Sequence, residues 1–187
     1  MEKGDIKQIL PPFLVSWSVT TKCNLSCKHC YSESNQEAGY DDLTTGESLS
    51  LIDEIADWGI GLLVFDGGEP LMREDFSQIA SYASGKGITT GIGSNGTMID
   101  TATARRLVSA GIRYASISID GADADTHDAF RGEAGNFNKA LEGASACKQA
   151  GLPFQFNTVL RKKTIPQVSD IFRLATDYGA YGVELFD

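Results

Sequence analysis

The sequence predicts an α/β fold built on a parallel sheet, and two observations carry this prediction. Short apolar or alternating runs typical of strands occur six times, and segments with apolar residues at helical spacing lie between them. Strands that alternate with helices in this way pair in parallel through right-handed crossovers. A length of 187 residues suits one domain with a substantial core. Periodicity does not decide between an open doubly wound sheet and part of a barrel.

The first half of the chain contains three predicted strands and three predicted helices. Residues Leu14 to Thr20 alternate apolar and small polar side chains, which predicts the first strand. Thr44 and Glu47 form a capping-box pattern that opens a helix, and Gly59 closes it. Residues Leu62 to Phe65 are all apolar, which favours a strand buried on both faces. The other elements of this half are a helix over 74–84, a strand over 88–93 and a helix over 101–110.

The second half repeats the alternation. Strands are predicted over 114–119, 154–160 and 183–186, and helices over 123–130 and 137–150. Thr164 and Gln167 form a second capping-box pattern, with Pro166 in the first turn of a helix that continues to Gly179. Phe172 has helical spacing with the apolar residues of that helix, so we expect it to be buried. The two tryptophans, Trp17 and Trp58, and the isolated Cys147 are also interpreted as core residues, and the alternative for Trp17 is that it lines the barrel.

The organisation of the chain is interpreted as a lead-in over residues 1–13 and one core domain over 14–187. Residues 31–43 are polar and predict a loop, and no linker or low-complexity segment interrupts the domain. The last predicted strand has no helix after it, and a barrel strand without its covering helix exposes its apolar outer face. We therefore expect a core domain truncated at its C-terminal side.

Composition and charge exclude several classes of function. The formal net charge of -9 argues against a nucleic-acid partner, because binding to phosphates depends on clustered Lys and Arg. The basic run Arg161, Lys162 and Lys163 is interpreted as a solvated loop. No apolar run approaches the roughly 20 residues of a membrane span, and the N-terminus lacks the pattern of a signal peptide. We therefore expect a cytoplasmic protein whose clustered cysteines bind metal rather than form disulfides.

Three cysteines follow the first predicted strand in the spacing C-x3-C-x2-C. Cys23, Cys27 and Cys30 can converge on one soft metal centre. A structural zinc site or an all-cysteine iron-sulfur site needs four protein ligands, whereas the local count is three. His29 is a strained fourth ligand because it lies within the same short loop. The simplest hypothesis is a cubane cluster held at three irons, with the fourth iron open to a non-protein ligand; a zinc knuckle that uses His29 is the alternative.

Polar residues follow the other predicted strands as well. Cys23, Glu69, Asn95, Asp120 and Asn157 all lie at or near the C-terminal ends of successive strands. Parallel α/β folds place their sites at this edge of the sheet. We therefore expect these side chains to gather on one face of the domain.

The three-cysteine spacing, followed by Gly67, Gly68, Glu69 and Pro70 after the next strand, resembles the radical S-adenosylmethionine (SAM) superfamily. The resemblance extends from about Phe13 to Asp187. It implies a partial (β/α)6 TIM-like barrel with parallel strands, in which the chain ends in the sixth strand. It also implies two cofactors, a 4Fe-4S cluster on the three cysteines and SAM on the open iron. In the family, reduction of the cluster cleaves SAM to methionine and a 5'-deoxyadenosyl radical, which abstracts hydrogen from the substrate.

The resemblance also implies a cofactor-binding role for several positions. The turn from Gly67 to Pro70 receives the amine of SAM, and Glu69 either touches that ligand or holds the turn. Two glycines without β-carbons let backbone carbonyls approach a ligand. Asn95 ends the strand that often lies beside SAM in the family. His29 occupies a position where relatives place an aromatic ring next to the adenine, and packing is the alternative.

The remaining candidates lie in the second half. Ser118 and Asp120 match the Ser-x-Asp-Gly strand end of the family, where Ser118 contacts SAM and Asp120 contacts it or caps the next helix. Arg131 matches the residue that supplies a cation to the SAM carboxylate, and a surface ion pair is the alternative. Asn157 meets the ribose or satisfies backbone groups. Glu184 points either into the barrel or into water.

Within the superfamily, the motifs look most like the branch of haem-pathway and peptide-modifying (SPASM-type) maturases and the molybdenum-cofactor cyclase. This implies hydrogen abstraction in cofactor biosynthesis, of the haem or molybdopterin kind, or in peptide or protein maturation. The implied partners are a small-molecule or peptide substrate and a reducing electron donor such as flavodoxin or ferredoxin. Two other classes stay open, an iron-sulfur electron-transfer protein without SAM chemistry and a zinc-stabilised binding module.

Overall fold

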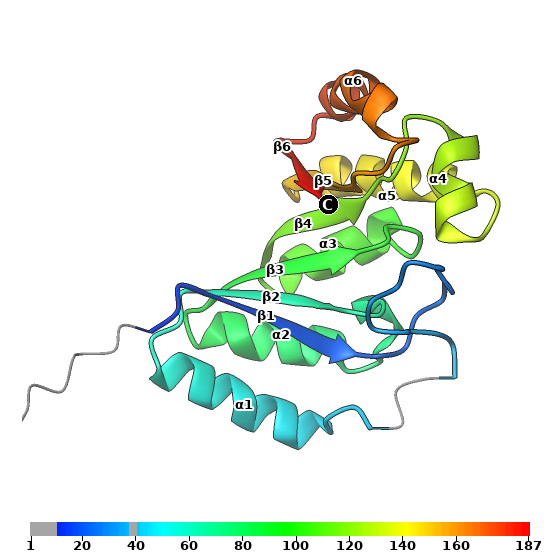
Figure 1. The fold of residues 1–187 in the computed structure, drawn as a ribbon. Helices are drawn as coiled ribbons and strands as arrows, with labels where there is room; N and C mark the ends of the chain where they lie inside the picture. Colours follow the sequence, from blue (N-terminus) through cyan, green and yellow to red (C-terminus); the bar gives the residue numbers. More distant parts are fainter. Residues whose placement is uncertain (1–10, 38–40) are drawn as a thin grey trace, which may run out of the picture.

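Six parallel strands form one curved sheet in the order of the sequence (Figure 1). A computed structural model of the protein describes residues 11–37 and 41–187, so most of the predicted lead-in lies outside the described residues. The strands are β1 (Leu14–Thr20), β2 (Leu62–Gly67), β3 (Thr89–Ser94), β4 (Ile112–Ser118), β5 (Phe154–Val159) and β6 (Gly182–Phe186). Each strand pairs only with its neighbours in the chain. This arrangement confirms the predicted parallel α/β fold with its last strand at the C-terminal end.

Helices connect successive strands and cover the outer face of the sheet (Figure 1). They are α1 (Thr45–Asp57), α2 (Phe76–Gly85), α3 (Thr101–Ser109), α4 (Ala124–Arg131), α5 (Asn136–Ala150) and α6 (Val168–Tyr178), with short 3-10 turns η1 (Pro70–Met72) and η2 (Ile165–Gln167). The predicted elements therefore all exist, and their boundaries differ by at most two residues for most of them. The loop predicted over 31–43 contains residues 38–40, which lie outside the described residues.

The core lies between the sheet and the helices. Phe65, Ile92, Ile117 and Phe156 are fully buried on the outer face of the sheet, where successive side chains of a strand alternate between faces. Leu62 and Val64 on the opposite face are only half-buried. The prediction of a β2 strand buried on both faces was therefore wrong, because its inner face lines the hollow of an incomplete barrel instead of packing on a second helix layer.

One of the two predicted capping boxes is present. In α1, the Thr44 hydroxyl accepts from the N–H of Glu47, and the Glu47 carboxylate accepts from the N–H of Thr44 at 2.8 Å. The second prediction was wrong: Thr164 makes no cap on Gln167. Its hydroxyl instead accepts from the N–H of Arg161 at 2.6 Å and ties the loop after β5. The 3-10 turn that contains Pro166 separates Thr164 from α6.

Two predicted core aromatics are exposed. Trp58 is 58% exposed because it follows the last turn of α1, and Phe172 is 45% exposed because α6 packs on the sheet through Ile171 and Ala175 instead. Trp17 packs partly buried against Phe65, and the two ring centroids lie 5.9 Å apart. It pairs in register with Phe65, so it lies on the outer face, and the alternative that it lines the barrel was wrong.

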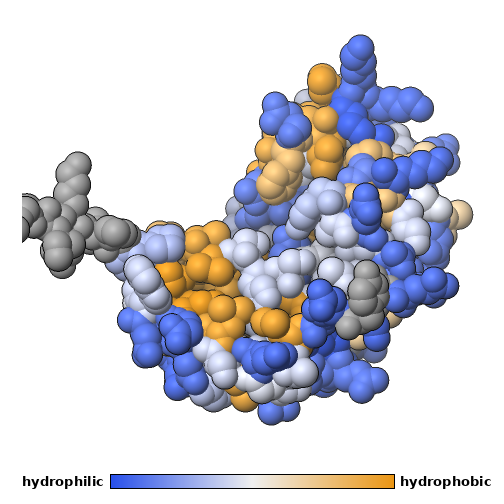
Figure 2. Space-filling view, turned by 60° about the horizontal axis from the view of Figure 1, so that its bottom comes forward, coloured by the Kyte–Doolittle hydropathy of each residue, from blue (hydrophilic) through white to orange (hydrophobic). Residues whose placement is uncertain are grey.

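The surface in Figure 2 shows hydrophobic side chains on both lobes of the molecule, with a notch between them. Large hydrophobic residues stay exposed at both edge strands, Leu14 in β1 and Leu185 and Phe186 in β6. The two edges of the sheet do not pair with each other. In the described part of the chain, none of the helices combines the length and the apolar character needed to cross a bilayer.

Candidate active site

The cysteine loop lies at the carboxyl edge of the sheet, directly after β1. In Figure 1 it is the dark blue loop on the side to which the β1 and β3 arrows point, and α4 lies beside it. The loop is held by its own backbone: the N–H of Cys23 donates to the carbonyl of Asn35, and the N–H of Cys30 donates to the carbonyl of Cys27. Both bonds are close to 3 Å, so the chain turns between Cys27 and Cys30 and returns to Cys23 at Asn35.

A cavity of about 400 Å³ lies between this loop and the inner face of the sheet. It brings together ten of the thirteen predicted site residues, namely Cys23, Cys27, His29, Cys30, Gly67, Gly68, Asn95, Ser118, Arg131 and Asn157. Residues from five strand ends, the cysteine loop and the end of α4 therefore face one space. Among the described residues, no three His, Cys, Asp or Glu side chains come close enough to hold a single metal ion, and the three thiols instead share the walls of this cavity.

The three thiols have different environments. Burial raises the pKa of Cys23 to about 11, against a hydrogen bond from the N–H of Leu25. Burial also raises the pKa of Cys27, although the Arg131 charge opposes it. For Cys30 burial acts in the same direction, but hydrogen bonds from Ser32 and Ser34 outweigh it, and its pKa lies below the ordinary value. Thiolates are the soft ligands of iron-sulfur clusters, so this donor set fits the implied group.

Glu69 supports the cavity from behind and does not line it. The side chain is fully buried and accepts hydrogen bonds from the hydroxyl of Ser94 and the N–H groups of Asn95 and Leu71, at 2.9 to 3.3 Å. Burial raises the pKa of Glu69 to about 7, against these three donors. Of the two roles left open for Glu69, the geometry matches the structural one. Pro70 is buried at the start of η1 and does not reach the cavity either.

Asn95 connects the end of β3 to the cysteine loop. Its amide nitrogen donates to the side-chain oxygen of Asn24 at 2.9 Å and lies 3.9 Å from the Cys23 sulfur. Its own side-chain oxygen accepts from the N–H of Thr97 at 2.9 Å. Glu69 therefore fixes Asn95, and Asn95 fixes the residue next to the first cysteine.

Asp120 and Arg131 form a buried ion pair. The Arg131 guanidinium donates to the Asp120 carboxylate at 2.6 and 2.7 Å, and Asp120 is fully buried. Asp120 also accepts from the N–H of Val159 at 2.8 Å. The helix α4 is capped by Asp123 instead, so the capping alternative for Asp120 was wrong. The surface-pair alternative for Arg131 was also wrong, because its side chain is mostly buried and borders the cavity.

A three-layer stack closes the side of the cavity next to α4. The rings of His29 and Phe130 are nearly parallel with centroids 3.7 Å apart, and the guanidinium of Arg161 lies 3.5 Å from the centroid of Phe130. Arg161 also donates to the backbone carbonyl of Asp120 at 3.1 Å. The prediction that Arg161 belongs to a solvated loop was wrong for this residue, although Lys162 and Lys163 are exposed. Burial lowers the pKa of His29, with the Arg131 charge second.

Two glycines, Gly67 at the end of β2 and Gly68 after it, are required by close contacts. A β-carbon on Gly68 would lie 2.1 Å from the carbonyl oxygen of Lys22, and one on Gly67 would lie 2.5 Å from the carbonyl oxygen of Thr20. Gly67 also has a φ of 122°, which side chains strain to adopt. The turn therefore packs directly on the backbone that leads into the cysteine loop.

Sequence reasoning missed several residues that line the cavity, namely Leu25, Tyr31, Ser32, Ser34, Asp66, Gly93, Ser94, Ser116, Val159 and Phe186. The alternation of side chains along a strand could have found some of them, because Ser116 lies two residues before Ser118 in β4 and Val159 lies two residues after Asn157 in β5. Glu184, which had two possible orientations, lies opposite Asn157 in the sheet register and accepts from Gln155 at 2.8 Å. It is therefore on the inner face.

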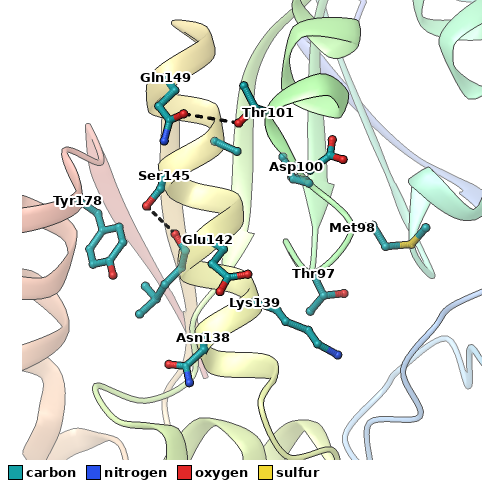
Figure 3. A pocket seen from close by; sticks show the side chains of 13 residues that line it. Thr97, Met98, Asp100, Thr101, Asn138, Lys139, Glu142, Ser145, Gln149 and Tyr178 are labelled. Carbon is teal, nitrogen blue, oxygen red and sulfur yellow. Dashed lines mark hydrogen bonds between the residues drawn. The ribbon is translucent and has the colours of Figure 1, made fainter.

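A larger cavity of about 730 Å³ lies elsewhere, on the outer side of the domain (Figure 3). Side chains from the segment before α3, from α5 and from the end of α6 surround it, including Asp100, Lys139, Glu142 and Tyr178. No cysteine borders it. The chemistry-bearing side chains are in the smaller cavity, so we take that one as the candidate active site.

The fold and this cavity together define an enzyme core of the partial-barrel class, with a thiol-rich site at the carboxyl ends of parallel strands. The family model of the radical SAM superfamily matches residues 17–175. The chain belongs to this superfamily. Membership implies a 4Fe-4S cluster and SAM as cofactors.

Two curated relatives illustrate the range of proteins that this chain resembles. An AdoMet-dependent heme synthase of Methanosarcina barkeri is 39% identical over 94% of this chain and 50% of its own length. A PqqA peptide cyclase of Granulibacter bethesdensis is 30% identical over 95% of this chain and 47% of its own length. The chain therefore spans about half the length of the curated relatives it matches.

Among solved structures, Streptococcus suis SuiB bound to S-adenosylmethionine has a TM-score of 0.82, covering 94% of this chain and 40% of SuiB. The identity is 16%, so this likeness shows the fold alone.

Proposed function

We propose that this chain is the catalytic core of a radical SAM enzyme that holds its cluster on Cys23, Cys27 and Cys30 and binds SAM in the adjoining cavity. When bound, the two cofactors supply reductive cleavage of SAM to a 5'-deoxyadenosyl radical that takes hydrogen from the substrate. The observation that carries this proposal is the convergence of the three thiols, Gly67, Gly68 and Arg131 on one cavity of about 400 Å³.

In this proposal, residues of the chain position the cofactors. Arg131 offers its guanidinium to the SAM carboxylate, and its ion pair with Asp120 holds the guanidinium in place. Gly67 and Gly68 present backbone carbonyls to the SAM amine. Ser118 and Asn157 face the same space from β4 and β5, where hydroxyl and amide groups suit the ribose. His29 offers one face of its ring to the adenine while Phe130 covers the other.

We further propose that the reaction serves the maturation of a cofactor or of a peptide. The similarity to an AdoMet-dependent heme synthase and to a PqqA peptide cyclase supports this range. A low-potential electron donor such as flavodoxin or ferredoxin supplies the electron.

The test is anaerobic reconstitution with iron and sulfide, followed by electron paramagnetic resonance of the reduced protein with and without SAM. A 4Fe-4S signal that changes on addition of SAM supports the proposal. A cluster whose signal ignores SAM favours an electron-transfer protein, and retention of zinc without visible absorption favours the zinc-stabilised module. The Cys147→Ala variant is the matched control, because Cys147 is fully buried in the core away from the cavity.

A further inference from the structure

One acidic side chain in the candidate active site has no role in the arrangement described above. Asp66 lies at the end of β2 on the inner face of the sheet and lines the cavity. It pairs in register with Ser18 of β1. On its other side a β-carbon at Gly93 would come within 3.0 Å of an Asp66 carboxylate oxygen. Gly93 has no side chain, and the Asp66 carboxylate occupies the space that a side chain there would fill.

The carboxylate of Asp66 has no protein partner among the residues that the structure describes. Within residues 11–37 and 41–187, no N–H or O–H group donates to it, and no Lys or Arg forms an ion pair with it. The two nearby buried carboxylates behave differently: Glu69 accepts from three donors, and Asp120 binds Arg131 and the N–H of Val159. Those two hold the structure together, whereas Asp66 faces the cavity and accepts no hydrogen bond from the described part of the chain.

The charge around Asp66 determines which ligand group it favours. The inner face carries a second acidic residue, Glu184, which binds only the neutral Gln155 among the described residues. The cation that borders the cavity, Arg131, is paired with Asp120 and, in the proposed function, serves the SAM carboxylate. The space beside Asp66 therefore favours ammonium or amide N–H groups over carboxylates, since a carboxylate opposite Asp66 adds like charge in a partly desolvated space.

We propose that Asp66 determines substrate specificity: it accepts a hydrogen bond from an ammonium or amide N–H of the substrate, next to bound SAM. The substrate class is therefore an amine- or amide-bearing molecule such as a peptide, and a substrate that presents only carboxylates to the barrel is disfavoured. This inference rests on the proposed function, because the cavity is a reaction site only if SAM binds in it. In this proposal Asp66 binds the substrate and takes no part in the reductive cleavage of SAM.

The test uses two three-carbon probes of similar size, propylammonium and propionate. Their binding to the reconstituted chain with SAM and without reductant is measured by saturation-transfer NMR. We expect propylammonium to bind about tenfold more tightly than propionate, which is the order expected for one charge-assisted hydrogen bond. In Asp66→Asn, which keeps the shape of the side chain and removes its charge, the preference falls to less than about twofold. Asp177→Asn, on the exposed surface of α6, is the matched control and keeps the preference.

A second readout locates the bound probe. On reduction with dithionite, the 5'-deoxyadenosyl radical takes deuterium from perdeuterated propylammonium and becomes deuterated 5'-deoxyadenosine. The carbon radical left on the probe takes an electron from dithionite and a proton from water. By mass spectrometry, Asp66→Asn lowers the deuterated fraction while total 5'-deoxyadenosine stays within about twofold of the wild-type level. Equal binding of the two probes by the wild-type chain overturns the inference without any variant, and so does an unchanged preference in Asp66→Asn. If no 5'-deoxyadenosine forms in the wild-type chain, the proposed function itself fails and the inference falls with it.

Discussion

The imidazole ring of His29 lies parallel to the phenyl ring of Phe130, with centroids 3.7 Å apart and planes inclined by 6°. His29 belongs to the cysteine loop and Phe130 to α4, about a hundred positions later in the chain. Arg161 packs on the Phe130 ring and reaches the backbone of Asp120. The stack therefore links the cysteine loop, α4 and the loop after β5 without any contribution from the cluster.

Replacing Phe130 with Ala removes the shared middle layer of this stack. We expect the free energy of unfolding of the apoprotein to fall by about 2 kcal/mol, because one aromatic pair and one cation–π contact are lost together. Urea denaturation followed by circular dichroism measures this. Phe172→Ala is the control, because Phe172 is 45% exposed and has no aromatic partner in the described structure. An equal loss in the two variants would show that the stack contributes nothing beyond ordinary burial.

Replacing Glu69 with Ala leaves three donors without their acceptor. The hydroxyl of Ser94 and the N–H groups of Asn95 and Leu71 all point at the Glu69 carboxylate. We expect the free energy of unfolding to fall by about 3 kcal/mol, because an unpaired buried donor is costly. Glu74→Ala, an exposed neighbour in the sequence, should change it by less than about 0.5 kcal/mol. A stable Glu69→Ala variant would mean that the donors find water and that Glu69 is not the support of this turn.

The fold was predictable because its signals are local. Apolar runs and helical spacing need only a few neighbouring residues, and parallel strands necessarily share a carboxyl edge. For this reason Cys23, Asn95 and Asn157 came together in one cavity, whereas Glu69 and Asp120 are fully buried and do not line it. The capping box at Thr44 is equally local, and it is present.

The failures have two causes, partners that are distant in the sequence and local hydrogen bonds that compete with the expected one. Arg161 looks like part of a charged loop, and only the fold brings Phe130 beneath its guanidinium. Thr164 and Gln167 satisfy the capping pattern, but the Thr164 hydroxyl binds the backbone of Arg161 instead. The exposure of Phe172 depends on the angle at which α6 meets the sheet, which helical spacing alone does not give. Asp66 was overlooked because the space for its carboxylate depends on Gly93 in the neighbouring strand, and the sequence alone does not show that the two residues are adjacent.

His127 should make stability depend on pH. Its ring is buried and its Nδ1 accepts from the N–H of Asp120 at 3.1 Å. Burial lowers the pKa of His127 to about 4, followed by the Arg131 charge. In the unfolded chain His127 binds a proton near pH 6.5, whereas in the folded chain it does so only near pH 4. Its contribution to the free energy of unfolding is therefore complete above pH 6.5 and is lost as the pH falls toward 4.

The pKa of His127 differs between the unfolded and the folded chain, and each pKa unit corresponds to about 1.36 kcal/mol. The free energy of unfolding should therefore fall by about 3 kcal/mol when the pH drops below 4. His127→Gln keeps an acceptor for Asp120 and does not titrate. The difference in unfolding free energy between wild type and His127→Gln should therefore shrink or reverse between pH 6.5 and 4, as urea denaturation would show. A difference independent of pH would mean that His127 takes up its proton in the folded state. Comparing the two proteins cancels the titration of Glu69, whose raised pKa acts in the opposite direction.

Replacing Cys27 with Ala should abolish cluster binding and leave the fold intact. Cys27 lies in the loop outside the hydrophobic core and is only partly buried, so its removal leaves the packing between sheet and helices unchanged. Cys147→Ala should do the reverse, because Cys147 is fully buried in α5: we expect a loss of about 1–2 kcal/mol in unfolding free energy with the cluster retained. Iron and sulfide analysis gives the cluster content, and circular dichroism gives the fold. Global unfolding of Cys27→Ala would show that the loop is part of the stable core, and a full cluster in Cys27→Ala would remove this cysteine from the proposed ligand set.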